Sequence, residues 1–200
     1  MEKLIFATNN QHKVEEIRLV LGDRFEIVTL KDAGIDIDIA EPHFTLEENA
    51  REKSVTIYNL TAKNCFSEDT GLEVTALNGE PGVKSARYAG EIASFDDNVG
   101  KLLENMHLVT NRKARFRTVI SLILNGQEFQ FEGVCNGKVI QEKRGKEGFG
   151  YDPVFIPDGS EMTFAEMGKI AKNEFSHRKK AMDKLISFLQ DAGDKLQMQN

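Results

Sequence analysis

Two long β-rich segments joined by Asn125-Gly126 are the feature that most constrains how this chain can fold. Residues 115–124 and 128–135 flank that dipeptide, and Asn-Gly between two such segments is a strong signal for a tight β-hairpin. A third segment, residues 138–143, is expected to extend the hairpin into a three-stranded antiparallel unit. Such a unit needs cover on one face, so we expect helices from elsewhere in the chain to pack against it.

Strands and helices alternate along the rest of the chain. Residues 4–8 and 26–30 are compact apolar strands, and apolar residues return at helical spacing from Val14 until Gly22 ends that helix. We expect three further long helices to start at polar caps, which are Thr45 (for a helix ending near Thr61), Ser94 and Ser176. A short helix is expected at residues 163–167. No repeat or linker splits the chain, so we expect residues 1–200 to form one domain.

Composition and charge narrow the possible partners. The net charge of -6 argues against a nucleic-acid polymer, because such a partner normally requires a basic surface. A small phosphorylated ligand stays possible, since a few lysines and arginines can gather locally. The two cysteines, Cys65 and Cys135, lie far apart in apolar segments and are expected to be buried free thiols. The first residues lack the apolar region of a secretion signal, and no segment is apolar over the length of a membrane span. We therefore expect a cytoplasmic protein.

Residues 65–72 read C-F-S-E-D-T-G-L and place two carboxylates, Glu68 and Asp69, side by side. Neighbouring side chains of a strand point to opposite faces, so only one carboxylate can face a given cleft if the strand continues through both. Thr70 and Gly71 predict that the strand ends there in a tight turn. One carboxylate at a strand end suits a divalent cation or a hydrolytic water. An acidic strand–turn junction without function is the alternative that this segment leaves open.

Two further segments have residue types that suit a phosphate group and a metal. A polar turn at residues 8–13 precedes the first helix, and its backbone amides together with Lys13 could bind a phosphate chain. A Walker sequence is absent, and a capped helix with a solvated lysine is the alternative. Glu41 lies in a loop just before a helix, where it can project as a metal ligand, and Asn49 and Lys53 share one face of that helix.

The C-terminal third contains a possible base-binding loop. Residues 145–157 combine three glycines with Phe149, whose ring could stack on a ligand; an aromatic loop packed on the core is the alternative. His177 and Arg178 lie in the first turn of the last helix, where positive charge opposes the helix dipole. Such a local conflict indicates function.

Taken together, these segments resemble the inosine/xanthosine triphosphate pyrophosphatase family. Six segments match in family order, at residues 8–13, 46–53, 68–72, 81–88, 148–153 and 176–178. The resemblance implies an α/β fold with an elongated mixed β-sheet flanked by helices, two lobes with a nucleotide cleft between them, and a homodimer. It also implies Mg²⁺-dependent hydrolysis of ITP, dITP and XTP to the monophosphate and pyrophosphate.

The resemblance also implies roles for individual residues. Substrate would be bound by Thr8, Asn9, Asn10, Gln11, His12, Lys13, Lys53, Thr70, Phe149, Gly150, Tyr151, Asp152, Lys172, His177 and Arg178. Lys13 and Lys53 would hold the triphosphate, whereas Phe149 would stack on the base. His177 and Arg178 would read the 6-oxo edge of the purine. Asp69 and Glu41 would bind Mg²⁺, and Asp69 would also be the general base.

Two alternatives to this function stay open. The first keeps the chemistry but changes the base preference, as in the related septum-formation inhibitor proteins. The second is a nucleotide-binding module without turnover. His177 and Arg178 near a stacking Phe149 favour 6-oxopurines, and Lys13 with Asp69 favours catalysis.

Overall fold

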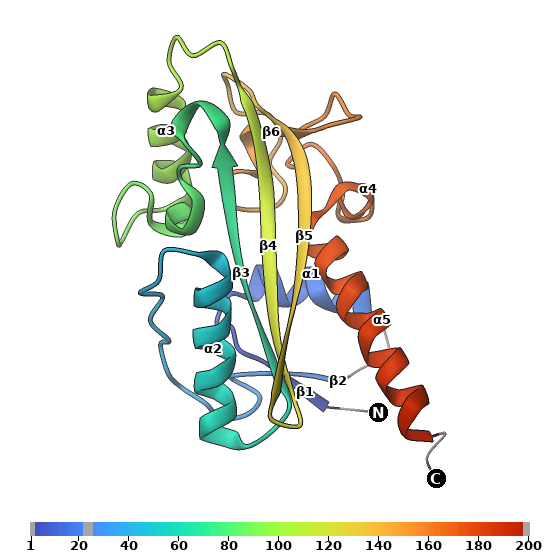
Figure 1. Ribbon diagram of the computed structural model, residues 1–200. Coiled ribbons are helices and arrows are strands. Elements are labelled where there is room, and N and C mark those ends of the chain that lie inside the picture. Colours follow the sequence, from blue (N-terminus) through green and yellow to red (C-terminus); the bar gives the residue numbers. More distant parts are fainter. Residues whose placement is uncertain (1–2, 22–25, 198–200) are drawn as a thin grey trace. The chain divides into compact units, whose positions relative to one another are not determined.

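A computed structural model describes residues 3–21 and 26–197 of the chain. Six strands form one mixed sheet in the order β2-β1-β3-β4-β5-β6 (Figure 1). The strands are β1 (Lys3–Phe6), β2 (Glu26–Thr29), β3 (Cys65–Val74), β4 (Lys113–Leu124), β5 (Gln127–Val139) and β6 (Phe155–Pro157). The helices are α1 (Gln11–Leu21), α2 (Leu46–Thr61), α3 (Phe95–Asn105), α4 (Lys169–Phe175) and α5 (His177–Gln197). The fold is therefore α/β, as predicted.

The chain divides into two compact units, and the long strands contribute to both. The first unit comprises residues 1–69, 119–133 and 178–200, and the second comprises residues 70–118 and 134–177. In the described part of the chain, no helix combines the length and the apolar character needed to cross a membrane.

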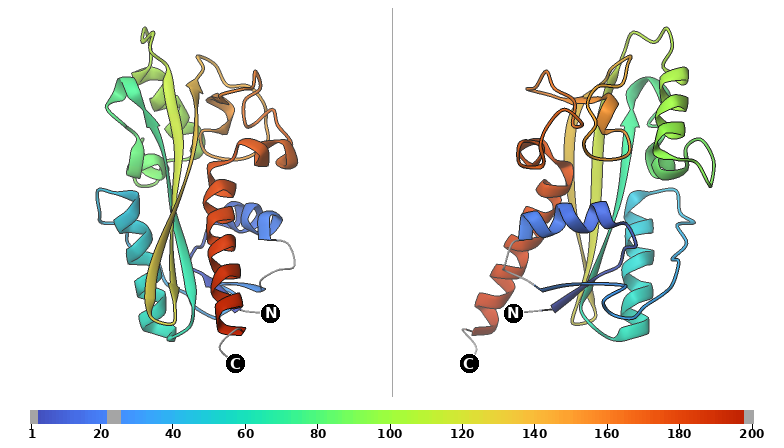
Figure 2. Two further views of the ribbon diagram at one scale, coloured as in Figure 1. Left: turned by 45° about the vertical axis from the view of Figure 1, so that its right-hand side comes forward. Right: turned by 180° about the vertical axis from the view of Figure 1, so that it is seen from behind.

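In the first unit, helices cover both faces of the strands (Figure 2). Ile57 of α2 packs on one face, against Ile5 of β1 and Cys65 of β3. Helices α1 and α5 cover the other face, where Phe6 and Phe66 stack with ring centroids 4.5 Å apart. These contacts follow the alternation of side chains along β1 and β3, which pair in parallel.

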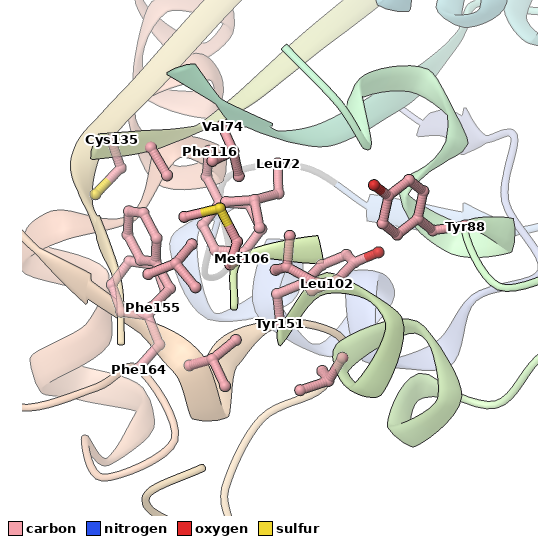
Figure 3. Packing of buried hydrophobic residues seen from close by; sticks show 14 of the residues in the cluster. Leu72, Val74, Tyr88, Leu102, Met106, Phe116, Cys135, Tyr151, Phe155 and Phe164 are labelled. Atoms are coloured by element: carbon pink, nitrogen blue, oxygen red, sulfur yellow. The ribbon is translucent and has the colours of Figure 1, made fainter. Parts of the chain in front are cut away.

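The second unit has a core of its own, rich in aromatic residues (Figure 3). Leu102 of α3 lies in this core, and Phe116 of β4 meets Phe155 of β6 edge to face with ring centroids 4.7 Å apart. Strand β6 pairs antiparallel with β5. Burial of several large rings gives this unit enough apolar surface to order the loops around it.

Several predicted elements are confirmed. Helix α2 begins after Thr45, whose hydroxyl accepts a hydrogen bond from the amide of Glu48, and it ends at Thr61 as predicted. Ser94 and Asp97 form a capping box at the start of α3. The hairpin turn follows β4 at residues 125–126, both with positive φ. Both cysteines are buried free thiols.

The predicted end of the strand at Thr70-Gly71 is wrong, since β3 continues to Val74. Gly71 is needed for a close approach rather than a turn, because a Cβ atom at this position would lie 2.5 Å from the carbonyl oxygen of Gly82. Leu72 to Val74 therefore belong to the same strand, which stops before a 3₁₀ turn at Thr75–Leu77.

Two further predictions in the second unit are wrong. Residues 138–143 form no separate strand, because β5 already includes Val139, and the next strand of the sheet is β6. Residues 163–167 form turns rather than a helix, with Thr163 and Glu166 exchanging hydrogen bonds between side chains and amides. Helix α4 follows them and was not predicted. The predicted helix end at Gly22 lies outside the described residues.

Candidate active site

The turn between β1 and α1 is ordered by its own polar side chains. Asn10 Oδ1 accepts hydrogen bonds from the amides of His12 and Lys13, at 3.1 and 3.3 Å, and the amide of Asn10 donates to Thr8 Oγ1 at 3.2 Å. Three of the amides that were expected to bind a phosphate, those of Asn10, His12 and Lys13, are therefore already bonded. The side chain of Asn9 donates to the carbonyl oxygen of Ile37, 3.1 Å away. A ligand at this turn would therefore meet mainly side chains, including those of the exposed Gln11 and His12.

Glu68 lies at the centre of a buried ion-pair network. Its Oε1 is 3.1 Å from Lys13 Nζ, and its Oε2 accepts a hydrogen bond from Arg178 Nε at 2.8 Å. Arg178 also pairs with Glu16 of α1. Burial disfavours the charged form of Glu68, but Arg178 and Lys13 outweigh burial and lower its pKa to about 2. Glu68 is therefore ionised at every working pH and holds Arg178 at the start of α5.

Asp69 belongs to a second cluster. Lys53 Nζ donates to Asp69 Oδ1 at 3.1 Å and to Glu41 Oε1 at 2.6 Å. Burial raises the pKa of Asp69 above its ordinary value; Lys53 opposes this effect and Glu41 adds to it. Burial also disfavours the charged form of Lys53, but Asp69 and Glu41 outweigh burial and raise its pKa. Lys53 thus stays protonated and orients two carboxylates.

A buried asparagine fixes the segment that contains Glu41. Asn49 accepts a hydrogen bond from the amide of His43 at 3.0 Å and donates one to the carbonyl oxygen of His43 at 3.3 Å. Asn49 and Lys53 are both buried on the same face of α2, as their spacing predicted. Helix α2 therefore positions Glu41 in two ways, through the backbone of His43 and through the ammonium group of Lys53.

The Asp69 cluster fits a divalent metal. In the described part of the chain, Asp69 Oδ2 is buried and accepts no hydrogen bond, and a buried carboxylate oxygen normally has a partner. No three side chains of histidine, cysteine, aspartate or glutamate gather into a metal cage among the described residues. Two carboxylates, with other ligands supplied by water and substrate phosphates, are the usual protein environment of Mg²⁺.

The charges of the two clusters do not by themselves favour an anion. Three cations, Lys13, Lys53 and Arg178, pair with four carboxylates, namely Glu16, Glu41, Glu68 and Asp69. A triphosphate would bring about four more negative charges into this environment. These ion pairs therefore leave no surplus of positive charge for a nucleotide.

The second unit contains most of the residues expected to contact the base. Asp152 Oδ2 accepts hydrogen bonds from the amide of Phe149 at 3.0 Å and from Lys172 Nζ at 2.7 Å. Lys172 Nζ lies 5.3 Å from the centroid of the Phe149 ring and 5.3 Å from that of Phe164, within cation–π range. Asp152 and Lys172 are both buried. The structure thus brings together three of the predicted residues, Phe149, Asp152 and Lys172.

Four other residues predicted to bind substrate are held by contacts within the second unit. His177 is buried and stacks on Phe116, with ring centroids 4.7 Å apart and planes 13° apart. The hydroxyl of Tyr151 donates to the carbonyl oxygen of Ser85 at 2.9 Å. The Thr70 and Thr118 hydroxyls lie 2.6 Å apart. Gly150, with a φ of +62°, lies in the turn after Phe149. These contacts fix the side chains in place, and their roles in substrate binding stay predictions.

Sequence reasoning missed Glu16 and left the role of Glu68 open. A signal for Glu16 was present, because it lies three residues after Lys13 and therefore shares a face of α1 with it. Nothing in the sequence placed Arg178 beside them, since 162 residues separate it from Glu16.

Comparison with known proteins finds a matching family and similar proteins over nearly the whole chain. The model of the Ham1 family matches residues 4–188. The dITP/XTP pyrophosphatase of Porphyromonas gingivalis is 52% identical over 190 residues, which cover 94% of this chain and 98% of that protein. The dITP/XTP pyrophosphatase of Flavobacterium johnsoniae is 46% identical over 187 residues, covering 94% and 97%. The solved structure of the Staphylococcus aureus Ham1 protein matches with a TM-score of 0.87 and 36% identity, over 96% of this chain and 100% of that one.

Proposed function

Since the chain belongs to the Ham1 family, we infer that it hydrolyses noncanonical purine nucleoside triphosphates such as ITP, dITP and XTP. The products are the nucleoside monophosphate and pyrophosphate. The observation that carries the inference is the Asp69 cluster. In this cluster Lys53 orients two carboxylates, and Asp69 Oδ2 is buried and accepts no hydrogen bond among the described residues.

Asp69 is the general base. Lys53 holds its carboxylate in one orientation through Oδ1, and the buried Oδ2, which accepts no hydrogen bond among the described residues, is left to accept a proton from water. Hydrolysis breaks a P–O bond of the α–β anhydride and joins the oxygen of water to phosphorus, while the proton from water passes to Asp69. Pyrophosphate leaves.

The proposal includes a bound Mg²⁺ ion, which Glu41 and Asp69 would hold. When bound, the ion supplies positive charge that polarises phosphoryl oxygens and neutralises charge on the leaving group. Lys13 and Lys53 bind the phosphate chain together with the turn that contains Thr8 and Asn10. Arg178 is paired with Glu68 and Glu16 and fixes this network at the start of α5. Its role beside His177 in reading the 6-oxo edge stays a prediction.

The second unit recognises the base. Phe149 offers a stacking surface, while Lys172 and His177 supply donors toward a 6-oxo group. An adenine presents a 6-amino donor where these donors would meet the 6-oxo acceptor, and such a mismatch can exclude a substrate by large factors. The predicted homodimer and cytoplasmic location stay predictions that sedimentation and cell fractionation can check.

The deciding experiment is incubation of the purified protein with ITP, dITP, XTP, GTP, ATP and dTTP in Mg²⁺, with identification of the phosphorus products. We expect IMP or XMP with pyrophosphate, and little product from GTP, ATP or dTTP. Turnover of dTTP in preference to ITP would instead indicate a different base preference. Binding of ITP without product would indicate a nucleotide-binding module.

A further inference from the structure

Gly148 lies against the side chain of Asp152 so closely that no other residue fits in its place. Its φ is +77°, and a Cβ atom built there would lie 2.0 Å from Asp152 Oδ2, 3.0 Å from Cγ and 3.2 Å from Cβ. Because all three atoms are close, rotating the carboxylate alone would not make room. Any side chain at position 148 would displace the whole side chain of Asp152.

The oxygen that meets Gly148 is also the one that organises the base end of the second unit. Asp152 Oδ2 accepts the hydrogen bonds from the Phe149 amide and from Lys172 Nζ. The carboxylate is buried, and Asp152 begins a 3₁₀ turn in which Pro153 restricts the backbone. One buried atom therefore sets the positions of both a backbone amide and an ammonium group.

These two groups lead directly to the surfaces proposed to contact the base. The amide belongs to Phe149 itself, so its hydrogen bond fixes the backbone from which the ring projects. The ammonium group of Lys172 lies 5.3 Å from the centroid of that ring. A displacement of Asp152 would consequently move the stacking surface and the cation together.

Resting on the proposed function, we propose that Gly148 and Asp152 are positioning residues that determine base specificity. Asp152 acts through Phe149 and Lys172 rather than by contact with the base, and Gly148 provides the space that this arrangement requires. The recognised ligand class is a purine with an acceptor at position 6. Selectivity therefore depends on a glycine that offers no side chain to the substrate.

The test is the ratio of kcat/KM for ITP to kcat/KM for ATP in Gly148→Ala. Misplacing a positioned group by about 1 Å can cost about 100-fold, so we expect the ratio to fall by about 10- to 100-fold, mainly through a higher KM for ITP. Inhibition by pyrophosphate should be unchanged, because pyrophosphate reports on the phosphate-binding residues of the first unit. An unchanged ratio in a folded Gly148→Ala protein would overturn the proposal.

Two glycines control for backbone strain. Gly79 has a φ of +90°, and a Cβ atom at this position would meet no heavy atom within 4 Å, so Gly79→Ala should retain both the rate and the ratio. Gly34 of the first unit has a φ of +69°, close to that of Gly148, and equally open space. Gly34→Ala should also retain both the rate and the ratio. A loss of the ratio in Gly34→Ala or Gly79→Ala equal to that in Gly148→Ala would attribute the effect to strain and overturn the proposal.

A double-mutant cycle decides whether Gly148 acts through Asp152. Asp152→Ala removes Oδ2 and Cγ, the two atoms that an alanine at position 148 would meet most closely, and keeps only Cβ at 3.2 Å. Adding Gly148→Ala to it should therefore change the ratio little further. Additive effects would overturn the proposal. If Gly148→Ala does not fold, Asp152→Asn takes its place, since the amide keeps the shape but loses the charge that faces Lys172. A wild-type ratio in Asp152→Asn and Asp152→Ala would also overturn the proposal.

Activity of the wild type and a control variant on ITP separates a failure of the positioning proposal from a failure of the proposed function. The wild-type protein and Gly79→Ala are assayed with ITP first. If neither produces IMP and pyrophosphate, the proposed function fails, and this inference fails with it. If both do, the outcomes for Gly148→Ala and the cycle concern positioning alone.

Discussion

Glu68 and Asp69 are consecutive residues of β3, yet their carboxylates lie on opposite faces of the sheet. Glu68 meets Lys13 of α1 and Arg178 of α5, whereas Asp69 meets Lys53 of α2. The alternation of side chains along a strand enforces this separation. Glu68 therefore balances the buried charge of two cations, whereas Asp69 keeps one buried oxygen that accepts no hydrogen bond among the described residues.

Glu68→Gln should destabilise the protein strongly. The substitution leaves two cations of this network, Lys13 and Arg178, of which Arg178 is 2% exposed, with one remaining carboxylate, that of Glu16. Removing one member of a buried ion pair costs about 3–5 kcal/mol. Urea unfolding at pH 7 should show a loss of this size, and Glu26→Gln, which breaks an exposed pair with Lys3, should change the free energy of unfolding by less than about 1 kcal/mol. Equal losses in the two variants would contradict the assignment of Glu68 to the fold.

Asp69→Asn should instead lower turnover strongly and change stability little. Without a general base, turnover of ITP should fall by about 100- to 10,000-fold. Stability should change little, because Lys53 keeps Glu41 as an anionic partner at 2.6 Å. Single-turnover kinetics and urea unfolding on the same preparation separate the two effects. Near-normal turnover in a folded Asp69→Asn protein would exclude Asp69 as the base.

Removal of Mg²⁺ should weaken substrate binding as well as stop turnover. Three cations already face four carboxylates in the two clusters, so a nucleotide without a metal meets no surplus of positive charge. Calorimetric titration with a non-hydrolysable ITP analogue should show an affinity at least about tenfold lower in EDTA than in Mg²⁺, corresponding to about 1.4 kcal/mol. Equal affinities would mean that the lysines bind the phosphates without a metal.

The Cys65 thiol should stay protonated and unreactive in the folded protein. Burial raises its pKa from 9.0 to about 12, and its Sγ lies 3.3 Å from the carbonyl oxygen of Ser54. Since the folded pKa exceeds the unfolded one, the stabilisation is complete below pH 9 and is lost as the pH rises toward 12. Above pH 9, the free energy of unfolding of the wild type should fall more steeply than that of Cys65→Ala, by up to about 1.4 kcal/mol per pH unit. Iodoacetamide at pH 8 should label Cys65 only after denaturation.

Local patterns predicted much of the fold, and long-range contacts explain the rest. Thr45 and Ser94 were recognisable as caps because a cap bonds to amides within three residues. The pairing of Arg178 with Glu16 was not recognisable, because only the tertiary fold brings α1 and α5 to the same face of the first unit. Glu41 and Lys53 were predicted through the resemblance, and the structure adds the hydrogen bonds by which Asn49 holds the preceding segment.

Gly71 shows why the predicted turn in β3 was wrong, and it supplies a test. Glycine is common in turns, but here it lies inside a strand, where a side chain would collide with the carbonyl oxygen of Gly82 at 2.5 Å. The contact is with backbone and is held in place by the bridge between Glu73 and Pro81, so it cannot relax as a flexible side chain would.

Gly71→Ala should therefore cost about 1–3 kcal/mol through overpacking. Gly100 of α3 is the matched control, since a Cβ atom there meets nothing within 4 Å, and alanine in an open helical position should stabilise by about 0.4–1 kcal/mol. Urea unfolding of both variants gives the comparison. A Gly71→Ala protein as stable as the wild type would show that the Gly82 segment can move away from β3.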